Sequence, residues 1–301
     1  MYSYKVAATT ANIGPGFDCM GICLDMYNTV RMEEIPSGLE ITVSGRDADK
    51  IPTDDTNYAY KMANTFFEET GYPPKGLKII LENEIPIARG LGSSASIVLG
   101  AFLCANDIAK TNLDRNQILY LATKIEGHPD NVAPAMFGGF VAGSFDAKTA
   151  EFTYKKLDVS SEITCIAMIP NYPVSTPAAR NLLPDVYSRQ DAISNVANAV
   201  LVALAFAKSD FSLLKKALKD NFHEPYRKKL IKEYDFFNQI SAKNNTLGTY
   251  ISGSGSTMIS FCKKEKAAKF LKNLEDAFET ANYKCEFKLL NIDNHGTYKI
   301  D

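Results

Sequence analysis

The sequence has little of what several protein classes require. It contains only three histidines among 301 residues, and its six cysteines form no C-x-x-C pair, so a structural zinc site is not expected. Most of the cysteines lie among apolar neighbours, which is typical of small core residues in a reducing compartment. We therefore expect a cytoplasmic protein.

Long apolar runs and dense basic runs are also missing. The amino terminus lacks an apolar signal core, and the longest apolar run, residues 196–207, is shorter than the about 20 residues that cross a membrane. We expect this run to be a buried helix. The densest basic segment, residues 226–230, has acidic residues nearby in a chain of formal net charge −2, as on a solvated helix face. Neither a membrane nor a nucleic acid is an expected partner.

What the sequence does have is an ordinary globular composition. Apolar residues make up 46% and charged residues 23%, and the length suffices for two domains with cores of their own. Strand-like and helical patterns interleave without a steady βαβ rhythm, which favours an α+β fold. We expect one domain over residues 1–155 and a second over residues 156–301.

The spacing of apolar residues predicts the individual elements. Thr111 and Asp114 form a capping-box pattern at the start of one expected helix. Strands are expected at residues 4–9, 39–44, 78–81 and 284–290, helices at 57–70, 93–109, 111–126 and 267–281, and a turn leading into a buried strand at 132–145.

One glycine-rich segment carries most of the functional information. Two glycines let its backbone turn tightly and approach a ligand with no Cβ in the way. The free N–H groups of the following helix can bind a phosphate, aided by the helix dipole. The serine hydroxyls can bond a phosphate oxygen or coordinate Mg²⁺. The segment reads Pro86-Ile87-Ala88-Arg89-Gly90-Leu91-Gly92-Ser93-Ser94-Ala95-Ser96.

Two commoner phosphate loops do not fit this segment. A Walker A loop needs a lysine after its glycines, and none is present. A Rossmann fingerprint needs a second strand ending in an acid about 20 residues on, where residues 109–112 predict a turn between helices. If this segment is considered alone, a plain Ser/Gly helix cap that binds no ligand is an alternative interpretation. Residues 9–18 and 252–257 are further polar, glycine-rich turns, and three such loops in this order argue against chance.

These three segments resemble the three motifs of the kinase superfamily named for galactokinase, homoserine kinase, mevalonate kinase and phosphomevalonate kinase. The resemblance extends from Lys5 to the end of the chain. Within the superfamily, residues 11–24, 126–135 and 175–184 most resemble the homoserine kinase family. The resemblance implies a two-domain α+β small-molecule kinase fold with the active site between the domains. The N-terminal domain is expected to be like a ribosomal-protein domain, and the C-terminal domain to be ferredoxin-like.

The resemblance also implies an activity. The family transfers a phosphoryl group from ATP, with Mg²⁺, to the side-chain hydroxyl of L-homoserine, giving O-phospho-L-homoserine in threonine biosynthesis. The partner is then a small-molecule substrate, and a homodimer is possible, as is common in the family. Another kinase of the superfamily, acting on a sugar, a mevalonate-like alcohol or shikimate, is the alternative. A non-catalytic regulator would be expected to lose Ser93, Ser94 or Glu126, and all three are present.

Roles for individual residues follow from the same resemblance. The whole of the segment from Pro86 to Ser96 is expected to bind the nucleotide. Mg²⁺ is expected on Ser94 and Glu126, and the catalytic residues are expected to be Asn131, Arg180 and His128. The acceptor is expected to contact Asn12, Asp18, His128, Asp130, Asn131, Arg180, Arg227 and Gly253.

The chemistry of these residue types agrees with those roles. An acidic Asp18 or Asp130 suits an ammonium group, and a guanidinium fork suits a carboxylate. Mevalonate kinase-like members place an Asp base about where this chain has Asn131, and an amide cannot accept a proton at neutral pH. We therefore expect no strong side-chain base, with the γ-phosphate or water taking the hydroxyl proton and His128 as a candidate relay. Glu126, at a helix C-terminus, faces the negative end of a dipole, which a nearby cation would offset.

Overall fold

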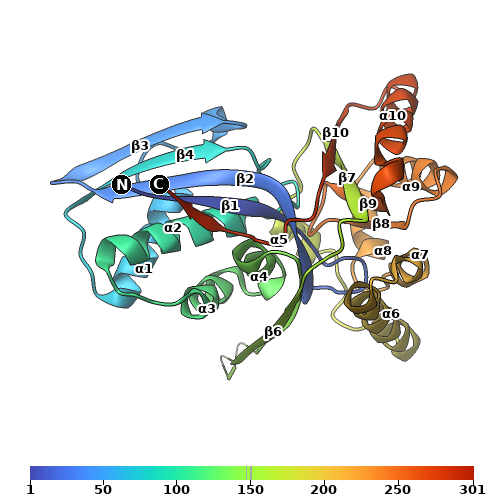
Figure 1. Cartoon of the computed structure of the whole chain (residues 1–301), viewed down its shortest axis with the longest axis horizontal. Coiled ribbons are helices and arrows are strands. Elements are labelled where there is room, and N and C mark those ends of the chain that lie inside the picture. Colours follow the sequence, from blue (N-terminus) through green and yellow to red (C-terminus); the bar gives the residue numbers. More distant parts are fainter. Residues whose placement is uncertain (147, 150) are drawn as a thin grey trace.

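The chain forms two β-sheets with helices packed on them, in a computed structural model that describes residues 1–146, 148–149 and 151–301 (Figure 1). The first sheet has seven strands in the order β11-β1-β2-β4-β3, and β5 and β6 extend it from β2. β3 and β4 pair in parallel, while the other pairs recorded in this sheet are antiparallel. Its strands are β1 (Tyr2–Ala11), β2 (Met20–Glu34), β3 (Gly38–Gly45), β4 (Gly76–Asn83), β5 (Phe140–Asp146), β6 (Glu151–Leu157) and β11 (Tyr298–Ile300).

Four helices cover one face of this sheet, below it in Figure 1. They are α1 (Tyr58–Thr70), α2 (Ser93–Ala109), α3 (Arg115–Glu126) and α4 (Pro129–Phe137), and a single-turn helix η1 (Ala48–Lys50) follows β3. The longest of them is α2, whose small and apolar side chains pack on β1 and β2 in the core. The predicted helices at 57–70 and 93–109 are confirmed, as are the strands at 4–9, 39–44 and 78–81.

Two local predictions in this region are wrong. The capping box lies three residues later than expected: Asp114 is the N-cap, and its carboxylate accepts from Gln117 while the Gln117 side chain accepts from the Asp114 amide. The turn expected at the start of residues 132–145 is instead part of the helix α4, whereas the strand expected to follow it is confirmed as β5. Pro129 occupies the first helical position, where its missing N–H costs nothing, and Pro134 lies inside the helix.

The second sheet has four antiparallel strands in the order β10-β7-β9-β8. Two helices, α9 (Tyr234–Lys243) and α10 (Lys264–Thr280), pack against it around a core of aromatic and aliphatic side chains. The strand predicted at 284–290 and the helix predicted at 267–281 are confirmed within three residues. The strands are β7 (Ile163–Pro170), β8 (Gly248–Ile251), β9 (Met258–Lys263) and β10 (Cys285–Leu290).

A shared hydrophobic core joins the two sheets. Phe140 of the first sheet stacks on Phe206 at a ring-centroid distance of 4.6 Å, and Phe206 contacts Phe261 of the second sheet at 5.8 Å. These side chains belong to one buried cluster that also contains Ile22 and Tyr250. Because the core is continuous, loops from both sheets are held in fixed positions beside it.

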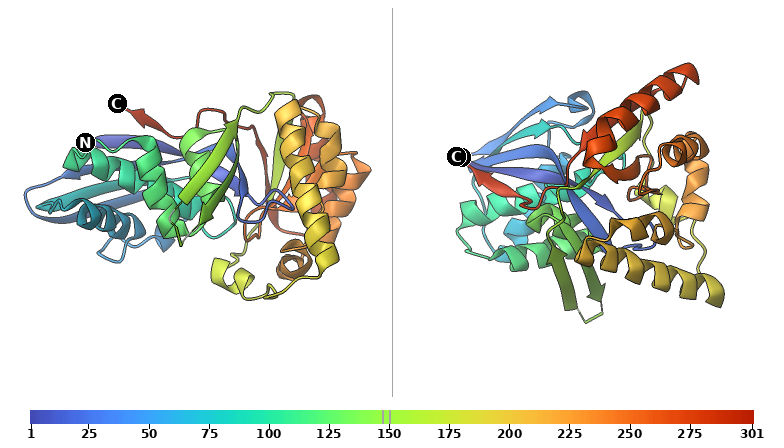
Figure 2. Two further views of the ribbon diagram at one scale, coloured as in Figure 1. Left: turned by 90° about the horizontal axis from the view of Figure 1, so that it is seen from below. Right: turned by 45° about the vertical axis from the view of Figure 1, so that its right-hand side comes forward.

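The remaining helices connect β7 to β8. They are α5 (Thr176–Arg180), α6 (Arg189–Lys208), α7 (Leu214–Ala217) and α8 (Glu224–Arg227), with the short helices η2 (Phe211–Leu213) and η3 (Lys228–Leu230). Figure 2 shows α6 along the outside of the molecule.

The buried helix expected at residues 196–207 is not buried on all sides. Val202, Ala205 and Phe206 of α6 reach the core, but Val196 and Val200 are 60% and 53% exposed. By length and composition alone, α6 could cross a membrane, and one such helix is weak support for a span.

The chain returns to its first sheet at the end. β11 pairs with β1, so both termini lie at the same sheet (Figure 1). β6 runs to Leu157 and pairs with β5, and the second sheet begins at Ile163. The boundary expected between residues 155 and 156 thus falls within β6, and the division into two domains at that point stays a prediction.

Candidate active site

The loop between β4 and α2 brings a helix N-terminus to a cavity. α2 begins at Ser93 directly after Gly92, whose φ of 72° lies in the left-handed region. Among the described residues no side chain caps this helix start, so its first N–H groups are left for a ligand. A Cβ at Gly92 would lie 2.1 Å from the Thr9 hydroxyl oxygen. This is the backbone geometry predicted for an anion site, and it requires glycine.

The three glycine-rich segments interlock through hydrogen bonds. The Thr9 amide donates to the Leu91 carbonyl at 3.1 Å, and the Ser252 hydroxyl donates to the Gly90 carbonyl at 2.6 Å. A Cβ at Gly90 would lie 2.1 Å from the Ser252 carbonyl oxygen. The loops of the two sheets therefore meet at backbone contact, which explains why each carries glycine at these places.

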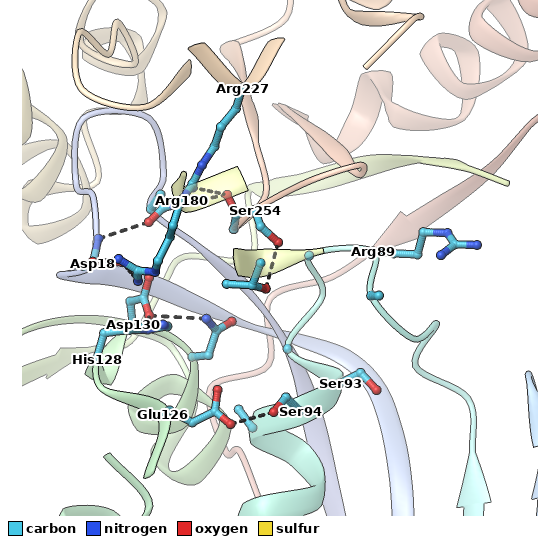
Figure 3. A pocket seen from close by; sticks show the side chains of 18 residues that line it. Asp18, Arg89, Ser93, Ser94, Glu126, His128, Asp130, Arg180, Arg227 and Ser254 are labelled. Carbon is cyan, nitrogen blue, oxygen red and sulfur yellow. Dashed lines mark hydrogen bonds and ion pairs between the residues drawn. The ribbon is translucent and has the colours of Figure 1, made fainter. Parts of the chain in front are cut away.

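These segments line one cavity of about 130 Å³ (Figure 3). All eight predicted acceptor residues and both predicted metal ligands lie on its wall. The sequence-predicted residues that line it are Asn12, Asp18, Ala88, Arg89, Gly90, Gly92, Ser93, Ser94, Ala95, Glu126, His128, Asp130, Asn131, Arg180, Arg227 and Gly253.

Four residues of the predicted nucleotide segment are not on this wall: Pro86, Ile87, Leu91 and Ser96. Arg89 lines the cavity, but its guanidinium points away from it in Figure 3. The guanidinium donates to the carbonyls of Pro170 and Asn171 at 3.0 and 3.2 Å, which ties the loop to the end of β7. The side chain of Arg89 therefore supports the loop from behind.

Ser94 and Glu126 meet at one end of the cavity. The Ser94 hydroxyl donates to Glu126 Oε1 at 2.6 Å, with the Tyr58 hydroxyl 3.4 Å from the same serine oxygen. Glu126 ends α3, and Gly127 in the left-handed conformation turns the chain away. Burial raises the pKa of Glu126, and the hydrogen bond from Ser94 opposes that shift. Two oxygen atoms on a partly desolvated wall are suitable ligands for a hard divalent cation.

Charged side chains from distant parts of the chain meet at the other end. Arg180 of α5 donates two hydrogen bonds, of 2.9 and 2.8 Å, to the Asp18 carboxylate. Asp18 has a positive φ of 57°, and its amide donates to the Asn12 side chain at 3.1 Å. Asp130, buried in the first turn of α4, is hydrogen-bonded to His128. This end of the cavity therefore contains both signs of charge.

His128 carries a proton at neutral pH. Burial alone would lower its pKa, but the carboxylate of Asp130 outweighs burial and raises the pKa to about 9. One ligand atom from each of Asp18, His128 and Asp130 lies within 4.8 Å of the others, so a cation could also be held here. Arg180 already pairs with Asp18, and His128 with Asp130, which leaves less negative charge for a metal than the Ser94–Glu126 end offers.

Arg227 of α8 is the least solvated cation of the cavity. Its side chain is 2% exposed, and its Nη1 donates to the Gly253 carbonyl at 2.9 Å. Within the described chain its Nε has no hydrogen-bond partner. Burial lowers the pKa of Arg227, and the neighbouring Arg180 adds to this. A buried guanidinium with spare N–H donors on a cavity wall is suited to an anionic ligand.

Known proteins resemble this chain over nearly its full length. The family models for the GHMP kinases N terminal domain and the GHMP kinases C terminal match residues 57–139 and 202–280. The curated homoserine kinase of Caldicellulosiruptor bescii is 40% identical over 98% of this chain and 96% of its own, and that of Clostridium botulinum is 41% identical over 99% and 98%. The crystal structure of homoserine kinase from Cytophaga hutchinsonii superposes with a TM-score of 0.86 at 25% identity, covering 99% and 97%.

The chain belongs to the homoserine kinase family of GHMP kinases. The family likeness predicted from the three glycine-rich segments is therefore confirmed, as is the mixed α/β kinase fold with two parts. The roles of single residues are a separate matter, because neither the family models nor the relatives assign them.

In this homoserine kinase family member, sequence reasoning missed several residues of the site. Thr176 and Ser254 line the cavity, with their hydroxyl oxygens 3.3 Å apart. Thr176 lies within residues 175–184 and Ser254 within residues 252–257, two segments that the sequence did single out, so a reading of whole motifs would have found both. Phe17 and His223 stack behind the charged end at a centroid distance of 5.3 Å, and only the tertiary structure brings them together.

Proposed function

We propose that this member of the homoserine kinase family transfers the γ-phosphoryl group of ATP to the side-chain hydroxyl of L-homoserine, giving ADP and O-phospho-L-homoserine. One observation carries the proposal. A single cavity joins an uncapped helix N-terminus, suited to phosphates, to an end with paired charges, suited to a zwitterionic amino acid. The relatives that match nearly the full chain are named homoserine kinase. The product places the enzyme in threonine biosynthesis.

The nucleotide lies at the α2 end in this proposal. Backbone N–H groups of Ser93 and Ser94 contact phosphate oxygens, and Gly92 gives the phosphates room to approach. Ser94 and Glu126 are the protein ligands of Mg²⁺, which supplies charge neutralisation on the phosphates. Their oxygens are already 2.6 Å apart, and burial raises the pKa of Glu126, so a divalent cation bound there would favour its ionised form.

The acceptor amino acid lies at the charged end. Asp18 and Asp130 face its ammonium group, and Arg180 and Arg227 face its carboxylate. Asn12, His128 and Gly253 complete this wall, with the Asn12 amide donating to the Gly253 carbonyl at 2.9 Å. The charges of the wall match those of a zwitterion, whereas a sugar or shikimate has no ammonium group for the acids.

Catalysis then rests on positioning and on charge neutralisation. The Asn131 side chain accepts from the Thr9 hydroxyl at 2.8 Å and has no basicity of its own. The hydroxyl proton of the acceptor therefore passes late to the γ-phosphate or to water, with His128 as a candidate relay. Arg180 and Asn131 act by holding the acceptor hydroxyl in line with the phosphoryl group.

A substrate panel tests the proposal. The purified protein is incubated with ATP and Mg²⁺ and, in turn, L-homoserine, galactose, mevalonate and shikimate, with ADP release measured by a coupled assay. The expected result is activity on L-homoserine far above the others. Preference for a sugar, mevalonate or shikimate would move the protein to another branch of the superfamily, and no turnover on any of them would favour a regulator.

A homodimer formed through α6 is proposed as the assembly in the cytoplasm. The exposed face of α6 carries Ile193, Val196, Val200 and Leu204, at a spacing that forms one stripe, and no residue from 192 to 207 is charged. Packing two copies antiparallel about Val200 would place Arg189 near Asp210 of the partner subunit, so the helix-end charges are complementary. Membrane-surface helices are rich in Lys and Arg instead.

Oligomer size tests this assembly. Analytical ultracentrifugation is expected to give a dimer for the parent and a monomer for Val200→Glu. The matched control, Leu289→Glu, changes an exposed apolar residue of β10 and is expected to remain dimeric. A monomeric parent, or a parent that instead binds anionic lipid vesicles, would contradict the proposal.

Finer fold assignments are also proposals. The strand order β10-β7-β9-β8 places the fourth strand beside the first and the third beside the second, which supports a ferredoxin-like C-terminal part. The likeness of the N-terminal part to a ribosomal-protein domain rests on the family resemblance.

A further inference from the structure

The two arginines at the charged end are compensated in different ways. Both terminal nitrogens of Arg180 donate hydrogen bonds to the Asp18 carboxylate. The same carboxylate therefore compensates the positive charge of Arg180 and occupies its N–H donors. Arg227 has one hydrogen bond, to a neutral carbonyl, although it is 2% exposed. The carboxylates of Asp18, Asp220 and Asp130 favour the charged form of Arg227, but within the described chain none of them forms an ion pair with it. A buried charge without a group in contact is costly, so a contact with the guanidinium itself would add stabilisation.

Phe17 provides such a contact. The guanidinium carbon of Arg227 lies 5.1 Å from the centroid of the Phe17 ring, and that of Arg180 lies 5.6 Å from it. Both distances are within the about 6 Å over which the negative face of an aromatic ring attracts a cation. Phe17 lies directly before Asp18, in the turn that follows β1. One ring therefore contacts both cations of the proposed carboxylate site.

His223 supports the ring. The two rings stack at a centroid distance of 5.3 Å and an interplanar angle of 24°. His223 Nε2 lies 3.0 Å from the Gly14 carbonyl oxygen, which can only accept, so the proton of a neutral imidazole is on Nε2. Burial lowers the pKa of His223, against the opposing effect of Asp220. The group behind Phe17 is therefore neutral and adds no third positive charge.

We propose that Phe17 is a positioning residue for the acceptor carboxylate. Its ring helps to stabilise the charge of Arg227 by direct contact without occupying any N–H donor, whereas a carboxylate in its place would take the donors, as Asp18 does at Arg180. The spare donors of Arg227 remain available to the substrate, and Arg227 is the principal carboxylate anchor. The inference rests on the proposed acceptor and extends it to a residue outside the cavity wall.

Replacing the ring by an aliphatic side chain of similar size tests the inference. Phe17→Leu is expected to raise KM for L-homoserine about tenfold, as loss of a desolvated cation–π contact would. KM for ATP should be unchanged, and so should activity on 3-amino-1-propanol, which is homoserine without its carboxylate. The matched control is Phe137→Leu, where the guanidinium of Arg115 lies 5.8 Å from a half-buried ring away from the cavity.

Two conservative changes at position 17 distinguish the electrostatic effect of the ring face from the effect of the ring's shape. Phe17→Tyr keeps the negative face and is expected to retain the parent KM for L-homoserine. Trifluorophenylalanine at position 17 keeps the shape but weakens the face, and is expected to raise KM as leucine does. The inference is overturned if fluorination leaves KM unchanged, or if the losses fall equally on ATP and on 3-amino-1-propanol.

A crystal structure of the Phe17→Leu variant tests this inference independently of the proposed function. The Arg227 guanidinium is expected to leave its place beside position 17, and an unmoved guanidinium would contradict the role of the ring. A parent enzyme that ignores L-homoserine would instead refute the acceptor, whatever the guanidinium does in the variant.

Discussion

The two ends of the cavity recognise charge by different means. At the α2 end the donors are backbone N–H groups, held by glycines whose positions leave no room for a Cβ. At the other end the groups are ionisable side chains that neutralise one another before any ligand arrives. The first end depends on local backbone geometry, and the second depends on partners from distant elements. Substitutions should therefore fail in different ways at the two ends.

The largest effect is expected at the α2 end of the cavity. In Gly92→Ala the new Cβ would lie 2.1 Å from the Thr9 hydroxyl, so the loop must move and ATP affinity should fall at least ~100-fold, or about 2.8 kcal/mol. Gly71→Ala is the control, because Gly71 also has a positive φ but nothing within 4 Å of its Cβ position. Calorimetry measures both, with circular dichroism to verify folding. Equal ATP affinity in the two variants would show that the close approach is unimportant.

The second-largest effect is expected at the charged end of the cavity. Arg180→Ala removes a proposed partner of the acceptor carboxylate and should lower kcat/KM for L-homoserine at least ~30-fold, since losing one partner of a charged pair that the bound substrate desolvates costs about 2–5 kcal/mol. Activity on 3-amino-1-propanol should hardly change. Arg31→Ala, which breaks a pair with Glu82 outside the cavity, is the control. Parent-like homoserine kinetics in Arg180→Ala would remove this arginine from the acceptor site.

A smaller effect is expected at Glu126, one of the two proposed metal ligands at the α2 end. Glu126→Gln keeps the shape of the side chain but removes a charged ligand, so the Mg²⁺ concentration for half activity should rise about tenfold, or about 1.4 kcal/mol. An exposed glutamate of α1, changed in Glu69→Gln, provides the comparison. Titration of activity with Mg²⁺ measures the concentration for half activity in both variants. Identical Mg²⁺ dependence in both variants would make Glu126 structural.

The smallest effect on activity is expected beneath the charged end of the cavity, where the prediction concerns stability. Burial raises the pKa of Glu224 in α8 to about 8, despite the hydrogen bond from the Ile251 amide. Because the folded state then holds a proton that the unfolded state loses near pH 4.5, stability should fall as pH rises from about 4.5 to 8. Urea unfolding of Glu224→Gln should show a flatter pH profile than the parent. The exposed Glu265→Gln should behave as the parent does, and a parent-like slope in Glu224→Gln would contradict the assignment.

The sequence was most informative where structure is local. The helix at residues 93–109 was predicted to the residue, because small and apolar residues follow a turn that needs glycine. α4 was missed, because Pro129 and Pro134 suggest a turn unless the first is recognised at a helix start. That omission matters, since α4 carries Asp130 and Asn131 into the cavity.

The exposed side of α6 was missed for a different reason. A run of apolar residues predicts burial, but it does not say whether the helix is covered on one side or on both. Val202 faces the core and Val200 faces outward in the same apolar run. Only the packing of α6 against the rest of the chain separates the two.

The sequence by itself determined the nucleotide loop, because glycine spacing and helix-starting residues specify a backbone shape within a dozen positions. It also identified the family. The tertiary structure alone decided which charges pair: Asp18 with Arg180 across 162 positions, and Phe17 with Arg227 beside His223. Such contacts depend on how two sheets share one core, and no local pattern encodes the distance between side chains so far apart in the chain.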